Sequence, residues 1–339
     1  MSVIKIEDIA HVKFRAPDLS KMRDFLTEFG LDSWHAEDGC LYARASDGIP
    51  YSHVTELGAP GFQGLGLRAE SVSDLERLAR AEGIEVHDLA TPGGGKCVVL
   101  TDPDGNMVEV VAGQEVSSPA PLPSEPHRNS ASAKTRQRQP VRLTEGPSHV
   151  MRLGHCVLNV SNFRASERWY KERFGFITSD EIEAASGLAI GAFMRCDRGD
   201  EPTDHHTLFL AQLPQKPGFM HAAFEVAGLD DLMLGHAHLK SKDRKAAWGV
   251  GRHILGSQIF DYWKDPWGHE LEHWTDGDLF TAADGSNTAS VDDLLAVQWG
   301  MQNPIFSGRL APSPGVLRFA IAMSARIKRL FQRNRASQK

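Results

Sequence analysis

Three short stretches in the second half of the chain carry residues that could hold a metal ion. They contain His155, His221 and a pair of carboxylates, Glu270 and Glu272. Two imidazoles and one carboxylate on one side of a metal leave its other coordination positions free. This arrangement suits ferrous iron that must bind both an organic substrate and O2. The residue types therefore favour oxygen chemistry at an open metal site.

Each stretch has the alternation of a β-strand, which indicates the face on which its candidate ligand lies. In 155–160 the even-numbered residues Cys156, Leu158 and Val160 form an apolar face, so His155 lies on the opposite face with Val157 and Asn159. In 220–226 the even-numbered residues, beginning with Met220, form the apolar face, and His221 lies opposite them. We therefore predict that both imidazoles leave their strands on the face away from the core.

The third stretch offers two acids on one face. Glu270, Glu272 and Trp274 alternate with a second set that contains His273. Periodicity does not separate Glu270 from Glu272 as the ligand. We expect Glu270 and His273 to be solvated. We also expect three tryptophans to pack the wall of the pocket: Trp263, Trp267 and Trp274.

Composition is that of an ordinary folded protein. The chain has 339 residues, a length sufficient for two domains with sizeable cores. Of these residues 41% are apolar and 24% are charged, so most of the chain should fold. A formal net charge of −7 gives no reason to expect a nucleic acid partner. The four cysteines are widely spaced, which favours reduced thiols. With neither a signal peptide nor a long apolar run, we predict a cytoplasmic protein without stable membrane association.

The chain divides into four parts. Residues 116–148 are rich in Ser, Pro, Gln and Arg and are predicted to be a flexible linker. Residues 1–115 and 149–280 are predicted to be the two main domains. The remainder, 281–339, is a C-terminal extension that ends in a basic, amphipathic helical stretch. We expect this helix to pack against protein rather than to bind a membrane.

The two main domains resemble each other, which sets the architecture. His11 lies in a string that parallels the one around His155, and the string Asp-Pro-x-Gly precedes both Glu109 and Glu272. Within each half, a strand, a helix and three more strands are predicted to occur twice. The fold class is therefore α+β, with two tandem domains of paired βαβββ modules.

The first half serves as a control for the metal site. It keeps His11 and Glu109 but has Gly64 where the second half has His221. Glycine has no side-chain donor, and two donors are fewer than a tightly held transition metal usually takes. We therefore predict that residues 1–115 hold no metal and act as scaffold.

These strings resemble the type I extradiol ring-cleavage dioxygenases of the vicinal oxygen chelate, or glyoxalase/bleomycin resistance, superfamily. The resemblance covers roughly residues 5–280. Its most specific string runs from Gly251-Arg252-His253 through Tyr262 and Asp-Pro-Trp-Gly to Glu272. Asp261 departs from the family, which usually has an aliphatic residue before the tyrosine. Finer strings resemble the members of the family that cleave trihydroxytoluene. The fold implied is two domains whose paired modules form open, barrel-like sheets.

By that resemblance, His155, His221 and Glu272 are the iron ligands and His206 is the acid–base residue. His205 is the competing choice, because a one-residue shift would exchange their faces. A histidine that titrates near neutrality suits a reaction in which one proton is removed from the substrate and one is delivered to an oxygen.

Two more residues have roles implied by the resemblance. His253 would donate to the developing negative oxygen and Tyr262 would position a substrate oxygen. The implied activity is Fe(II)-dependent cleavage of a catechol or trihydroxylated aromatic, with O2 as co-substrate, a small aromatic diol as partner and a homo-oligomeric assembly. Mn(II) could replace iron. The alternatives are a metal-dependent isomerase or epimerase of the same superfamily, or a non-enzymatic small-molecule binder.

Overall fold

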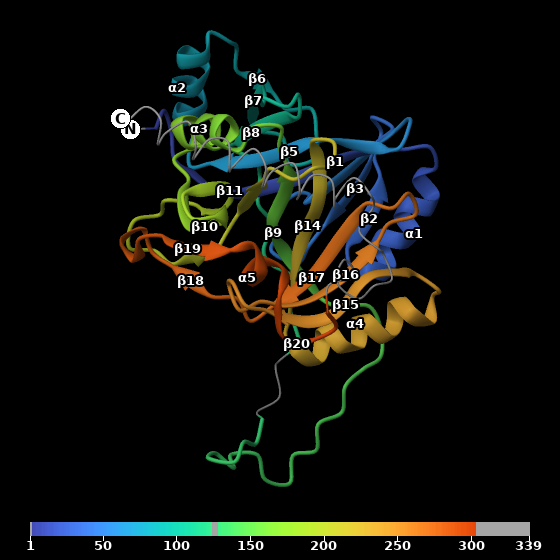
Figure 1. Ribbon diagram of the computed structural model, residues 1–339. Helices are drawn as coiled ribbons and strands as arrows, with labels where there is room; N and C mark the ends of the chain where they lie inside the picture. Colours follow the sequence, from blue (N-terminus) through green and yellow to red (C-terminus); the bar gives the residue numbers. More distant parts are fainter. Residues whose placement is uncertain (1, 124–127, 303–339) are drawn as a thin grey trace, which may run out of the picture.

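The computed structural model describes residues 2–123 and 128–302, and its strands form two large sheets (Figure 1). The first is eight-stranded, in the order β2-β3-β4-β1-β5-β8-β7-β6. The second is ten-stranded, in the order β19-β10-β11-β13-β9-β14-β17-β16-β15-β20, and a small two-stranded sheet pairs β12 with β18. Each large sheet is built from two βαβββ modules, so the predicted α+β fold with paired modules is confirmed.

The first half contains two modules joined through the antiparallel pair of β1 and β5. The first module comprises β1 (Ile6–Ala16), α1 (Leu19–Phe29), β2 (Asp32–His35), β3 (Leu41–Arg44) and β4 (His53–Leu57). The second comprises β5 (Gly61–Ala69), α2 (Val72–Glu82), β6 (His87–Asp88), β7 (Lys96–Thr101) and β8 (Met107–Ala112).

The second half repeats this plan around the antiparallel pair of β9 and β14. Its first module comprises β9 (Val150–Asn159), α3 (Phe163–Phe174), β10 (Ile177–Ala185), β11 (Leu188–Arg195), β12 (Thr203–Asp204) and β13 (Leu208–Ala211). Its second comprises β14 (Gly218–Val226), α4 (Leu229–Ser241), β15 (Lys245–His253), β16 (Ile259–Lys264) and β17 (Glu270–Thr275).

The first helix of each half begins and ends through the same local chemistry. Asp18 and Asn162 each accept a backbone N–H from the first turn of their helix, which satisfies a donor that has no intrahelical partner. Gly30 and Gly175 end the helices in the left-handed region, with φ of 110° and 75°. The chain can therefore turn back into the next strand without strain.

The two halves pack into one core. In Figure 1, α1 lies beside α4, and α2 beside α3. Phe14 of β1 meets Phe219 of β14 edge to face, with ring centroids 5.0 Å apart. His273, which we expected to be solvated, is fully buried at this junction. Its Nε2 lies 2.7 Å from the carbonyl oxygen of Phe29, to which it donates. That expectation was wrong because the strand face bearing His273 packs against the other half of the chain.

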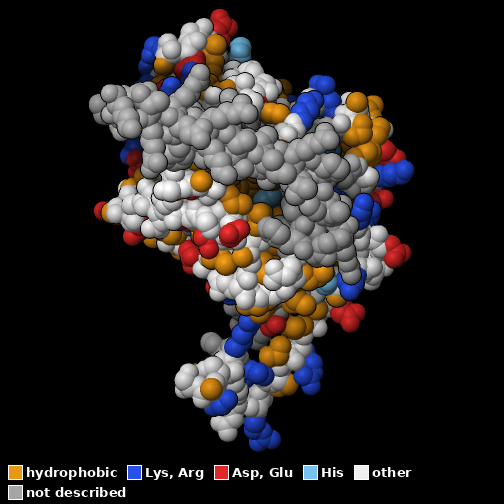
Figure 2. Space-filling model, viewed as in Figure 1, with side chains coloured by type: hydrophobic (Ala, Val, Ile, Leu, Met, Phe, Trp, Pro, Cys, Tyr) orange, Lys and Arg blue, Asp and Glu red, His pale blue; other side chains and the backbone are white. Residues whose placement is uncertain are grey.

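The connection between the halves, residues 113–149, contains no helix or strand in the part that the structure describes. Figure 1 shows it as a loop below the sheets, and Figure 2 shows Lys and Arg side chains gathered over that loop. Most of its residues are exposed. We keep 1–115, 116–148 and 149–280 as proposed bounds of the domains and linker.

The C-terminal extension adds strands to both edges of the ten-stranded sheet. It follows β18 (Leu279–Phe280) and comprises the 3-10 turn η1 (Ala282–Asp284), β19 (Asn287–Ser290), α5 (Val291–Leu295) and β20 (Val297–Gly300). Strand β19 pairs with β10, and β20 pairs with β15. The predicted basic helical stretch falls after residue 302 and lies outside the described residues. Within the described ranges, no helix is long and apolar enough to cross a membrane.

Candidate metal centre

The three candidate ligands come from three neighbouring strands. His155 lies on β9, His221 on β14 and Glu272 on β17, and β14 is the strand between the other two. Ala223 of β14 pairs with His155 on one side and with Glu272 on the other. The alternation predicted for β9 holds, because Cys156 and its even-numbered neighbours enter the core. The sheet thus brings two imidazoles and a carboxylate to one face.

A β-bulge in β14 corrects one detail of the prediction. Phe219 pairs with Leu158 and His221 pairs with Val157, so Met220 is an extra residue on this strand. Met220 does not share the core face with the other even-numbered residues of β14, as we had expected. It packs on the site side, against the cluster that contains Val157. Bulges of this kind re-aim side chains next to functional sites.

The ligand atoms of His155, His221 and Glu272 all lie within 4.8 Å of one another. Glu272 Oε2 lies 3.4 Å from His155 Nε2 and 3.2 Å from His221 Nε2. Among the residues that the structure describes, this is the one group of three such side chains that could hold a metal ion. Glu272 rather than Glu270 belongs to it. Glu270 instead forms an ion pair with Lys264 at 3.0 Å.

The environment of Glu272 fits a bound cation. Its side chain is fully buried, and neither carboxylate oxygen has a hydrogen-bond partner among the described residues. Burial raises the pKa of Glu272, but three neighbouring imidazoles outweigh burial and hold that pKa well below its usual range. A buried carboxylate without donors is costly. A divalent cation shared with the two imidazoles removes that cost, and the donor set suits a first-row transition metal.

His253 and Tyr262 lie beside the candidate ligands. His253 ends β15 and Tyr262 lies on β16, opposite Glu272 in the strand register. The His253 Nε2 atom lies 3.1 Å from the Tyr262 hydroxyl and 3.7 Å from Glu272 Oε1. Burial and the nearby Glu272 carboxylate raise the pKa of Tyr262 well above its usual value. Tyr262 is therefore a neutral hydroxyl that can donate a hydrogen bond.

The ring of His206 lies against the candidate ligand His155, whereas His205 contacts His206. The ring centroids of His206 and His155 are 4.0 Å apart. His205 instead places its Nε2 2.5 Å from the Asp180 carboxylate and its Nδ1 3.1 Å from the Nδ1 of His206. Burial, with the neighbouring His155 and His205, lowers the pKa of His206 well below its usual value. Asp180 was missed from the sequence because it lies on β10, outside every motif.

Asp261 lies on the far side of its strand from the site. Its carboxylate accepts hydrogen bonds from Trp263 Nε1 at 2.5 Å and from His236 Nδ1 at 3.1 Å. The departure from the family pattern at this position therefore leaves the face bearing Tyr262 unchanged. Trp263 belongs to the core, so our expectation that it packs the pocket wall was wrong. Of the three tryptophans, Trp274 is the one beside a candidate ligand, 6.2 Å between ring centroids from His155.

The apolar wall of the site comes from other residues. A separate cluster contains Val157, Ile182, Phe193 and Phe209, with Met220 packed against it. Phe193 stacks on Phe209 and meets His206 edge to face at 4.7 Å. The C-terminal extension contributes Val291 and Leu294 to the same cluster. The extension, which the sequence left unassigned, therefore completes the surroundings of the site.

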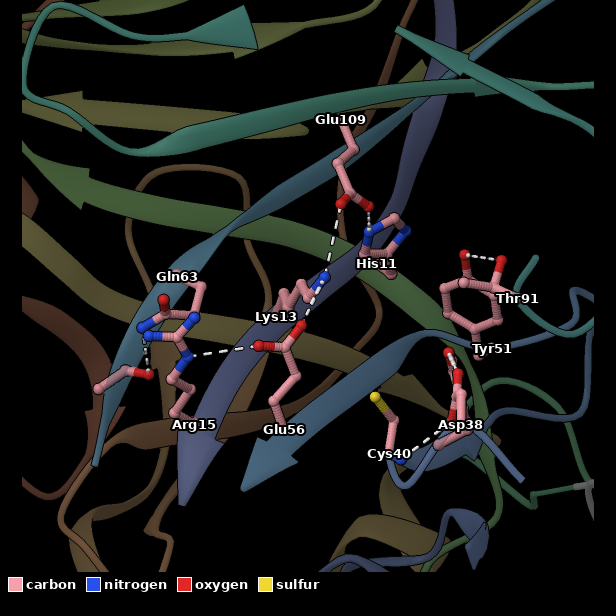
Figure 3. Close-up of polar contacts among 12 residues, drawn as sticks. His11, Lys13, Arg15, Asp38, Cys40, Tyr51, Glu56, Gln63, Thr91 and Glu109 are labelled. Atoms are coloured by element: carbon pink, nitrogen blue, oxygen red, sulfur yellow. Dashed lines mark hydrogen bonds and ion pairs between the residues drawn. The ribbon is translucent and has the colours of Figure 1, made fainter. Parts of the chain in front are cut away.

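The first half contains a counterpart of the site in which the donors have closed on each other (Figure 3). His11 Nε2 lies 2.8 Å from Glu109 Oε2. Lys13 Nζ lies 3.6 Å from the other carboxylate oxygen, which places a positive charge next to Glu109. Gly64 takes the strand position of His221. The absence of metal from this half stays a prediction, and the Lys13 ammonium gives it an electrostatic reason.

Comparison with known proteins gives the family. The profile of the Glyoxalase/Bleomycin resistance protein/Dioxygenase superfamily matches residues 8–110 and 152–273, which is more than half of the chain and includes both halves. The chain belongs to this superfamily. Two curated relatives are Metapyrocatechase 2 of Cupriavidus necator (28% identical over 314 residues, 88% of this chain and 90% of the relative) and 3-methylcatechol 2,3-dioxygenase of Pseudomonas putida (26% over 283 residues, 80% and 90%). The resemblance to extradiol dioxygenases is confirmed.

Two solved structures share the fold of this chain. The Mn(II)-bound glyoxalase of Novosphingobium aromaticivorans has a TM-score of 0.72 at 22% identity, covering 88% of this chain and 93% of that one. The 2,3-dioxygenase LapB of Pseudomonas sp. KL28 has a TM-score of 0.71 at 16% identity, covering 86% and 100%. These likenesses extend over both halves, so the paired-module architecture is that of the superfamily.

Proposed function

We propose that this protein is an Fe(II)-dependent extradiol dioxygenase that opens the ring of a catechol or trihydroxylated aromatic and inserts both atoms of O2. The observation that carries the proposal is the group of buried His155, partly buried His221 and buried Glu272, with His206, His253 and Tyr262 around it. An isomerase or a binding protein of the superfamily would have no need of the three surrounding proton carriers.

His155, His221 and Glu272 would hold the metal. Fe(II) bound there supplies the redox chemistry that removes the spin barrier between O2 and the aromatic diol, and it acidifies the diol hydroxyls. The protein supplies proton transfer and positioning. His206 is neutral in its buried setting and would accept a proton from a substrate hydroxyl.

The other two polar side chains would act on substrate oxygens. Tyr262 keeps its proton and would donate to one substrate oxygen, while His253, 3.1 Å from the tyrosine hydroxyl, would donate to negative charge that develops on another oxygen. The apolar cluster around Phe193 and Phe209 would pack against an aromatic ring and keep water away from it. Trihydroxytoluene and methylcatechols are therefore the first substrates to test.

The test begins with purified protein loaded anaerobically with Fe(II). Addition of a diol and air should produce oxygen uptake and a yellow ring-fission product, and mass spectrometry with labelled O2 should find both oxygen atoms in that product. A parallel sample loaded with Mn(II) tests whether iron is required. No oxygen uptake across a panel of catechols and trihydroxybenzenes would contradict the proposal and leave the isomerase or binding function standing.

A further inference from the structure

Three buried side chains form a line that ends beside the candidate metal ligands. Asp180 lies on β10, and His205 and His206 lie between β12 and β13. The exposed fractions of Asp180, His205 and His206 are 7%, 1% and 3%. His205 Nε2 lies 2.5 Å from Asp180 Oδ2, and His205 Nδ1 lies 3.1 Å from His206 Nδ1. The ring of His206 then lies against the ring of His155, tilted by 43° with the centroids 4.0 Å apart.

The Asp180 carboxylate, which can only accept hydrogen bonds, determines which nitrogen atoms of His205 and His206 carry protons. An ionised carboxylate accepts hydrogen bonds only, so His205 must carry its proton on Nε2. A neutral His205 then has a lone pair on Nδ1, and the short contact between the two Nδ1 atoms requires one donor. That donor is His206, which leaves Nε2 of His206 as the basic atom. The carboxylate of Asp180 thereby selects the tautomer of a residue that it does not touch.

Hydrogen bonds also fix the backbone next to Asp180 and His205. Ser179, next to Asp180, donates its hydroxyl to the carbonyl oxygen of His205 at 2.6 Å. The buried Arg195 guanidinium donates to the Ser179 hydroxyl at 2.9 Å. The His205 ring meets Phe193 and Phe280, with ring centroids 5.2 and 5.4 Å away. His205 therefore has little freedom to turn its ring and exchange the roles of its two nitrogens.

We propose that Asp180 and His205 are positioning residues of a hydrogen-bonded relay that fixes the tautomer and ring orientation of His206 and leaves its Nε2 unprotonated for the role of general base. This inference rests on the proposed function of the site. When a substrate O–H bond breaks, an N–H bond forms at His206 Nε2. His206 Nε2 later returns that proton to an oxygen of the product, with no change in oxidation state.

The first test reads the tautomers directly and does not depend on turnover. The full-length protein is labelled with 15N-histidine and loaded with Zn(II), which is diamagnetic, and the two-bond nitrogen–proton correlations of His205 and His206 are recorded. Signals are assigned from His205→Gln and His206→Gln variants. The relay requires protonated Nε2 on His205 and protonated Nδ1 on His206. A protonated Nε2 with a bare Nδ1 on His206 would overturn the proposal.

The second test uses kinetics of the Fe(II) enzyme. Asp180→Ala should lower kcat by about 10- to 100-fold, which is part of the usual contribution of general acid–base catalysis, while KM changes by less than about threefold. Asp180→Asn keeps an oxygen acceptor of nearly the same shape and should recover part of kcat, which also guards against simple misfolding. Glu181→Gln is the matched control, because Glu181 lies on the same strand and pairs with Arg164 instead. It should behave as wild type.

The outcomes separate the relay from the proposed function. If Asp180→Ala and the control have the same kcat, the relay is wrong even when the wild type cleaves diols. If the wild type consumes no O2 with any diol, the proposed function fails, and the nitrogen spectra still decide the tautomers. Equal losses for Asp180→Ala and Asp180→Asn, with the iron content of both variants reduced, would indicate a purely structural role and would also overturn the relay.

Discussion

Gly66 and Ala223 occupy the same place in the two halves of the chain, between a histidine on one side and a glutamate on the other. At Gly66 the His11 ring lies over the backbone, where an added Cβ would be 2.2 Å from the ring, and His11 meets Glu109 at 2.8 Å. At Ala223 the methyl group is present, and His155 Nε2 stays 3.4 Å from Glu272. The histidine and the glutamate are in direct contact where this methyl group is absent and are further apart where it is present.

Ala223→Gly should weaken metal binding. Without the methyl group, the His155 ring can lie across β14 and pair directly with Glu272, and this pair competes with the cation. We expect an affinity for Zn(II) or Fe(II) about tenfold lower, equivalent to about 1.4 kcal/mol. Competition with a chromophoric chelator measures it. Ala222→Gly, on the core face of the same strand, should lower stability without this loss of affinity. Equal affinities for wild type and Ala223→Gly would contradict the role of the methyl group.

Gly66→Ala should lower the stability of the first half and leave the metal affinity of the second half unchanged. The new methyl group would collide with His11 and force the ring away from Glu109. Overpacking of this kind costs about 1–3 kcal/mol. Urea unfolding followed by circular dichroism should show an earlier transition. Gly61→Ala is the control on the same strand, because the nearest atom to its new Cβ is 4.0 Å away. A Gly66→Ala protein as stable as that control would show that the His11 ring moves freely.

His206→Ala should remove turnover and leave the metal in place. His206 contacts His155 but lies outside the group of three ligands. Loss of general acid–base catalysis typically lowers kcat by about 10²- to 10⁴-fold. Steady-state oxygen uptake and iron analysis of the same sample measure both effects. His35→Ala, at an exposed position of β2, is the control. Loss of iron from His206→Ala would mean that His206 is a ligand.

The first half should lose stability in acid because of His53. Burial lowers the pKa of His53 from its usual 6.5 to about 3. Between these values the unfolded state binds a proton that the folded state does not, so the unfolded state is favoured as pH falls. The stability due to neutral His53 is complete above pH 6.5 and is lost toward pH 3, by up to about 5 kcal/mol.

The measurement compares urea midpoints of wild type and His53→Gln at pH 8, 5 and 4. Glutamine does not titrate, so its protein should lose less stability over this range than the wild type does. The two other ionisable groups with the largest effects on His53 are Asp265 and His269, and both are unchanged in the variant. Parallel pH dependences for the two proteins would exclude His53 as the cause.

The repeat made the fold predictable from sequence. The matched strings around His11 and His155 gave the module plan, and alternation placed His155 on the correct face of β9. What failed depended on contacts between distant parts of the chain. Alternation assumes a regular strand, so it missed the bulge at Met220. Alternation shows which residues are polar but not whether that face of the strand meets solvent or another part of the chain. His273 was therefore predicted to be solvated, although it packs against Phe29.

The surroundings of the site were the least predictable part. Asp180 is an ordinary acid in a strand sequence, and its role is visible only where β10 passes His205. The family resemblance could assign His206, because the motif includes it, but it could not reveal a partner outside the motif. Val291 and Leu294 were likewise unassigned, because nothing local to a short polar tail indicates which surface it covers.

The strands β19 and β20 set a lower limit on the length of an active fragment. The two outer strands of the ten-stranded sheet, β19 and β20, both come from the segment Asn287–Gly300. Helix α5 connects these two strands. A protein cut at Phe280 would leave β10 and β15 with unpaired backbone amides and would bare Ile182 and Phe193 to water. Shortened versions intended for crystallography or engineering therefore need to retain residue 300 if they are to stay dispersed in solution.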